Sequence, residues 1–149
     1  MGGGYEYHDD IPGADAAFRA WGGSLGELFS AAWMAVRGVM LDAEHQPAAA
    51  ASGAERRKVE LTAGEPDLLL LDFLQEQLYL KDADGMLYVP ISVTADRAPT
   101  AWHLSAELAG EPIDTASAAL GTEVKAVTLD TLGVRQTPGG WEATVVLDL

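Results

Sequence analysis

The sequence predicts an α+β fold: a two-layer sandwich in which two main helices pack on one side of a mostly antiparallel sheet. Two segments carry apolar residues at helical spacing, and strand-like alternation separates them. The expected order is strand, strand, helix, strand, helix and then four strands, which is not the strict alternation of a parallel doubly wound fold. At 149 residues the chain fits one domain, 1–149, large enough to bury about two thirds of its unfolded surface.

The N-terminal part predicts two strands and a helix. Residues 5–8 and 15–21 alternate as strands do, with turn-like residues between them. Ser24 suits the N-cap of a helix over residues 24–41, because Glu27 stands three residues later at the spacing of a capping box. We expect residues 1–4 to form a flexible terminus.

The middle of the chain predicts a loop, a strand and a second helix. Residues 42–54 are rich in Ala, Pro, Ser and Gly and show no period, so a flexible loop is expected. Residues 56–63 alternate as a strand. A helix with a leucine stripe follows Gly64, and Pro66 suits its first turn.

The C-terminal half predicts strands over residues 86–94 and 100–108, followed by an irregular segment at 110–114. Residues 121–149 read as a closing hairpin whose turn is at residues 138–140. Because the chain finishes in an apolar, β-branched run, we expect its last residues to be tied into the sheet.

Composition excludes several classes of protein and site. The chain has 9 basic and 23 acidic side chains, a net charge of −14, so strong direct binding to nucleic acid is not expected. It has no cysteine, which excludes disulfides and thiolate metal sites. No apolar run approaches the roughly 20 residues of a membrane span, and no signal-peptide pattern is visible. We therefore expect a cytoplasmic protein with no membrane contact.

The common catalytic fingerprints are missing from the sequence, which has no glycine-rich phosphate loop, no G-x-S-x-G and no H-E-x-x-H. The three histidines, His8, His45 and His103, fall in three different segments. A surface or structural role is expected for each. No catalytic residue and no organic cofactor is assigned.

Two aspartates stand out by position. Asp15 opens one expected strand, where aspartate is depleted, and Asp148 closes another. Two carboxylates at neighbouring strand ends, with a backbone carbonyl, would suit a hard cation such as Mg²⁺, Mn²⁺ or Ca²⁺. Alternatively, Asp15 pairs with a backbone N–H in the turn and Asp148 merely caps the chain. Spacing alone favours this second interpretation.

Glu123 and Lys125 stand two residues apart in an expected strand. Such a pair of opposite charges is commonly a surface ladder worth a few tenths of a kcal/mol to about 1 kcal/mol. The charges alone do not indicate a function.

Several segments together resemble the archease family. Residues 121–128 with 140–141 and 145–149 are similar to its C-terminal signature, and residues 110–114 to the G-E-P-x-D before it. The other similar segments are residues 69–79, which resemble its second helix, and residues 14–22, which resemble its early A-D…R-A-Y/W-G strand. The correspondence runs from about residue 5 to residue 149.

This resemblance implies an accessory protein in place of an enzyme. Archeases assist the GTP-dependent RNA ligase of tRNA splicing and RNA repair, promoting its guanylylation and its repeated turnover. The family's metal site matches Asp15, Asp148 and the backbone of Leu149, which favours the cation-site interpretation. Glu123 and Lys125 match a charged patch that could face the ligase.

The chain departs from the family pattern at three places. Residues 11–14 lack the histidine that usually precedes T-A-D, residues 128–130 replace T-Y-H, and Gly121 stands where lysine is common. Two rival functions are a chaperone-like protein-binding module unrelated to ligation and a metal-dependent hydrolase. The hydrolase is disfavoured, because two carboxylates without a neighbouring histidine or lysine base make a thin catalytic set.

Overall fold

The computed structural model describes residues 3–8, 16–40, 55–112, 123–130 and 132–149. The predicted loop at 42–54 and Asp15 lie outside the described residues. Gly4, expected in a flexible terminus, begins the first strand. Within the described part of the chain, no helix is long and apolar enough to cross a membrane.

The strands form two sheets in which every pairing is antiparallel. The five-stranded sheet has the order β1-β2-β8-β6, with β7 also paired to β8, and the three-stranded sheet has the order β3-β5-β4. The strands are β1 (Gly4–His8), β2 (Ala16–Gly22), β3 (Glu55–Ala63), β4 (Met86–Arg97), β5 (Trp102–Pro112), β6 (Ala126–Leu129), β7 (Arg135–Thr137) and β8 (Gly140–Asp148).

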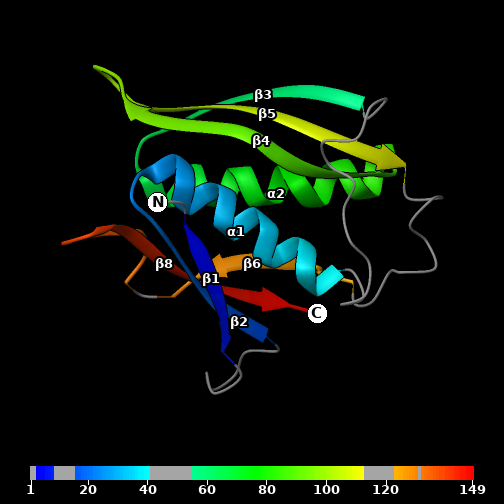
Figure 1. Ribbon diagram of the computed structural model, residues 1–149, viewed down its shortest axis with the longest axis horizontal. Coiled ribbons are helices and arrows are strands. Elements are labelled where there is room, and N and C mark those ends of the chain that lie inside the picture. The colour runs from blue at the N-terminus through cyan, green and yellow to red at the C-terminus, as the bar shows by residue number, and fades with distance from the viewer. Residues whose placement is uncertain (1–2, 9–15, 41–54, 113–122, 131) are drawn as a thin grey trace.

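Helices α1 (Leu25–Met40) and α2 (Pro66–Asp84) lie between the two sheets (Figure 1). The α+β sandwich is confirmed, but the strands form two sheets where the sequence suggested one. The residues of α1 itself are small or apolar on most sides of the helix, and 11 of its 16 residues are buried. A helix that is apolar on most sides needs cover on most sides, and the second sheet supplies it.

The predicted helix ends agree closely with the structure. The Ser24 hydroxyl accepts the Glu27 N–H at 3.2 Å, and the Glu27 carboxylate accepts the Gly23 N–H at 2.8 Å. Both side chains therefore satisfy N–H groups at the start of α1. Pro66 stands in the first turn of α2, and Gly85 ends that helix at φ 66°, a conformation that favours glycine.

Two strands continue further than predicted. β4 runs on to Arg97, and β5 includes the start of the segment that the sequence suggested was irregular. Residues 110–112 pair with residues 86–88, so ladder hydrogen bonds hold this stretch extended despite its glycine and proline. Pairing with β4 therefore makes this segment a strand, although its local sequence does not favour one.

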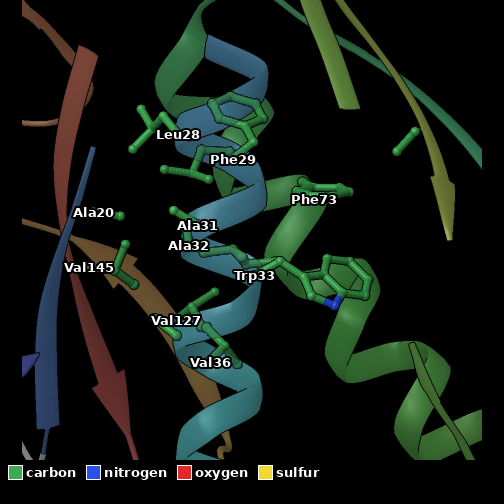
Figure 2. Close-up of a cluster of buried hydrophobic side chains, with 14 of the residues drawn as sticks. Ala20, Leu28, Phe29, Ala31, Ala32, Trp33, Val36, Phe73, Val127 and Val145 are labelled. Atoms are coloured by element: carbon green, nitrogen blue, oxygen red, sulfur yellow. The ribbon is translucent and has the colours of Figure 1, made fainter. Parts of the chain in front are cut away.

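Trp33 ties both helices to the three-stranded sheet. Its indole N–H donates to the Tyr88 carbonyl at 2.8 Å, and its own carbonyl accepts from the Gln77 amide at 3.1 Å. Its ring lies 4.7 Å from that of Phe73 between centroids. On the other side of α1, Ala20, Val127 and Val145 of the five-stranded sheet face the helix (Figure 2).

We predict that Gly26→Ala destabilises the protein. Alanine normally stabilises a helix interior relative to glycine by roughly 0.5–1 kcal/mol. At Gly26, however, a Cβ would run into the main-chain carbonyl of Val93 in β4. The expected loss is about 1–3 kcal/mol in the free energy of unfolding, measured by urea denaturation.

Gly64→Ala is the matched control, because a Cβ at Gly64 meets no atom within 4 Å. Its stability should remain within about 0.5 kcal/mol of the parent protein. If Gly26→Ala proved as stable as Gly64→Ala, α1 would not approach β4 as closely as described.

Candidate functional site

The candidate site lies at the end of β8, the strand that pairs with β2 on one side and with β6 and β7 on the other. Ala143, Val145 and Leu147 are buried against the helices. Glu142 and Thr144 occupy the opposite face, because successive side chains of a strand point to opposite sides of the sheet. Asp148 continues this outer face at the end of the strand.

The main chain of Asp148 is held while its side chain is exposed. Asp148 lies opposite Ala126 in the β6–β8 register, and its carbonyl accepts the Lys125 N–H at 2.7 Å. Leu149 is half-buried and packs against the core. The expectation that the last residues are tied into the sheet is confirmed. Because the backbone is fixed, the exposed carboxylate projects from a defined place.

Asp15, the other predicted ligand, lies outside the described residues. The described part of β2 begins one residue later, at Ala16, which lies opposite Leu147. The chain positions next to the two aspartates are therefore cross-strand neighbours.

The oxygen donors at the end of β8 are of the kind that hard cations prefer. They are the exposed carboxylate of Asp148 and the main-chain oxygen of Leu149. Among the described residues, no three histidine, aspartate or glutamate side chains gather closely enough to hold a metal ion. The described donors thus fit a hard cation in chemistry and need a further ligand to complete a set.

Glu123 and Lys125 lie beside this end of the sheet. Both are exposed, whereas Val124 between them is buried at 3% exposure and anchors the segment. The expected strand starts only at Ala126, because β8 ends at Asp148 and offers residues 123–124 no partner. No ion pair joins the two side chains in the described structure. Their charges remain available to solvent or to a partner.

A cluster of charged residues on the outer face of the same sheet was not predicted. Arg19 lies 3.3 Å from Glu142, and Arg135 donates from Nε to Glu142 at 2.8 Å. The Arg19 guanidinium stacks over the Trp21 ring at 4.3 Å. The expected alternation of residues 15–21 is consistent with Arg19 and Trp21 sharing one face, but their partners depend on the strand register. The two arginines hold the Glu142 carboxylate in place.

Two other aspartates have structural roles. The Oδ1 atom of Asp130 accepts the N–H groups of Leu132 and Gly133 at 3.1 and 3.2 Å. Asp67, in the first turn of α2, accepts the Val134 N–H at 3.3 Å. Together they hold the loop that leads into β7.

The described histidines are consistent with surface roles. His8 lies 3.2 Å from a Glu6 carboxylate oxygen at the edge of the five-stranded sheet. His103 lies on β5, opposite Thr62 and Asp96. His45 lies outside the described residues. The two described histidines are therefore on different sheets.

Comparison with known proteins covers nearly the whole chain. Residues 5–149 match the family model described as "Archease protein family (MTH1598/TM1083)". The Methanosarcina mazei "Protein archease" is 35% identical over 146 residues, covering 97% of this chain and 95% of that protein. The protein of the same name from Methanothermobacter thermautotrophicus is 35% identical, covering 98% and 99% of the two chains.

A solved structure shares the fold. The solution structure of Methanobacterium thermoautotrophicum protein 1598 superposes with a TM-score of 0.77 at 32% identity, covering 98% of this chain and 99% of that one. The similarity thus extends over both sheets and both helices. On its sequence and on its fold, this chain belongs to the archease family.

Proposed function

We propose that this protein activates a GTP-dependent RNA ligase in tRNA splicing and RNA repair, promoting guanylylation of the ligase and its multiple turnover. Membership of the archease family supports an accessory role. The observation that carries the proposal is the end of β8, where a fixed main chain presents the exposed carboxylate of Asp148.

The proposed activity depends on a divalent cation, Mg²⁺, Mn²⁺ or Ca²⁺, held by Asp15, Asp148 and the backbone of Leu149. Carboxylate and carbonyl oxygens are the ligands such cations prefer. Asp15 precedes Ala16, which pairs with Leu147, so the β2–β8 register favours bringing the two aspartates to the same end of the sheet. When bound, the cation supplies positive charge that offsets the charge of phosphate groups.

The protein's own residues hold and orient the ligands. Ladder hydrogen bonds to β2 and β6 fix the backbone before Asp148, and the Lys125 N–H fixes its carbonyl. The backbone that carries the carboxylate is therefore already ordered before the ligase binds, which lowers the entropic cost of assembly.

The charge distribution suits docking on a basic partner. A net charge of −14 favours encounter with an RNA-handling protein and disfavours competition for its RNA. Exposed Glu123 and Lys125, beside Asp148, are proposed to face the ligase and to set the orientation of docking.

Asp148→Ala should abolish most of the stimulation of ligase guanylylation. Removing even a group that supports a metal ligand typically costs 10–100-fold, so loss of a ligand should cost about tenfold or more. The rate of guanylylation is measured with ligase, GTP and divalent metal. Calorimetric titration of the isolated protein with Mn²⁺ should show weakened binding.

Asp96→Ala is the matched control, because Asp96 is an exposed aspartate on the other sheet. Both variants should keep the parent stability within about 0.5 kcal/mol. Undiminished stimulation by Asp148→Ala would eliminate the proposed site. Absence of stimulation by the parent protein would reject the activator function and favour a protein-binding module.

Lys125→Ala should slow association with the ligase, because the proposed docking pairs the Lys125 ammonium group with an acidic group of the ligase. A charge at the rim of an interface acts mainly on the association rate and its salt dependence. An exposed pair contributes about 0.2–1 kcal/mol, so the rate should fall by up to about fivefold. Surface plasmon resonance at increasing salt should show the difference from the parent protein shrinking.

Lys58→Ala removes the same charge from an exposed lysine on β3. Its association rate should match that of the parent protein after allowance for the common change in net charge. Loss of a lysine makes the protein more acidic and by itself should speed encounter with a basic partner. Equal association rates for the two variants would therefore mean that Lys125 contributes only to the overall charge.

A further inference from the structure

A groove of about 280 Å³ separates β1 from the first turns of α1. Residues 3–5 line one side, and Glu27, Ser30 and Met34 line the other, with Ala31 between them. The groove belongs to the opposite edge of the five-stranded sheet from β6, so it is distinct from the end of β8.

The strand side of the groove is largely main chain. Side chains at Gly3 and Gly4 would collide with Trp21, at its carbonyl oxygen and its indole ring. Glycine therefore lets β1 lie against β2 at this point and leaves backbone as the wall of the groove. β1 is also the outermost strand of the sheet, and an edge strand presents unpaired main-chain groups to a partner.

The helix side combines an anion with apolar surface. Oε1 of Glu27 accepts the Gly23 N–H at 2.8 Å, which holds the carboxylate in place. Its Oε2 accepts no hydrogen bond from the part of the chain that the structure describes. Met34 and Ala31 provide apolar contacts, Ser30 provides a hydroxyl group, and Tyr5 also lines the groove.

We propose that this groove receives an arginine or lysine side chain of a protein partner. The volume lies just below the usual range of ligand pockets, about 300–1,000 Å³, which suits one long side chain better than a nucleotide. The aliphatic stem packs on Met34 and Ala31 while the cationic head meets Glu27. The net charge of −14 favours a basic occupant at a distance as well.

The probe is the blocked tripeptide acetyl-Ala-Arg-Ala-amide, titrated into the ¹⁵N-labelled full chain and followed by NMR. Saturable shifts are expected at the amides of Gly3, Gly4 and Ser30. The same peptide with norleucine in place of arginine has the stem without the charge and should bind much more weakly. No ligase is present, so the outcome does not depend on the proposed activator function.

Glu27→Gln keeps an oxygen for the Gly23 N–H and removes only the charge. Because a hydrogen bond to a charged group contributes a factor of about ten or more, the dissociation constant should rise about tenfold. Asp72→Asn removes a charge from the exposed face of α2 and should leave the affinity unchanged. Ser30→Phe fills the groove and should block binding while the spectrum stays that of a folded protein.

Three results would overturn the proposal. One is equal binding of the arginine and norleucine peptides. Another is equal weakening by Glu27→Gln and Asp72→Asn, which would show general attraction to an acidic surface. The third is the absence of saturable shifts around the groove at millimolar peptide.

Discussion

The antiparallel register of β8 is the constraint on which the candidate site depends. Hydrogen bonding to β2 on one side and to β6 on the other fixes which face each residue takes. A slip of one residue would turn Leu147 outward and Asp148 toward the core, exposing an apolar side chain and burying a charge. Burial of Val145 and Leu147 thus determines where the carboxylate of Asp148 lies. Packing and the geometry of the candidate site are thus coupled through one strand.

The layer of helices packs on the inner face of this sheet and supports it. α1 contacts both sheets, and Trp33 links it to α2 and to β4 through two hydrogen bonds and the contact with Phe73. Gln77, buried at 5% exposure, uses its amide N–H for this link, and its Oε1 accepts no hydrogen bond from the described residues. A buried unpaired acceptor costs about 1–3 kcal/mol. The extensive apolar burial around Trp33 offsets that cost.

Sequence reasoning succeeded where a local signal exists. The capping residues Ser24 and Glu27, the proline at the start of α2 and the apolar, β-branched run at the end of the chain all act within a few residues. It failed where the outcome depends on distant partners. The division into two sheets, the extension of β5 to Pro112 and the pairing of Arg19 with Glu142 follow from strand register, which a single sequence does not encode locally.

The end of β8 was predictable, because its apolar run and its final aspartate are adjacent. The groove beside Glu27 was not predictable, since it lies between β1 and α1. It depends on the close approach of Gly3 and Gly4 to Trp21 on the neighbouring strand.

Hydrogen bonding separates structural carboxylates from those available to ligands in this acidic protein. Asp130 and Asp67 bind backbone N–H groups of one loop, and Glu142 is held by two arginines. These groups are occupied by the fold itself. Asp148 and Glu27 differ, because each is attached to a fixed backbone yet keeps carboxylate oxygen free of the described chain. A held but unsatisfied anion is what a cation or a basic side chain requires. The same physical criterion therefore selects the two proposed sites, one for a metal at the end of β8 and one for a partner beside the edge strand β1.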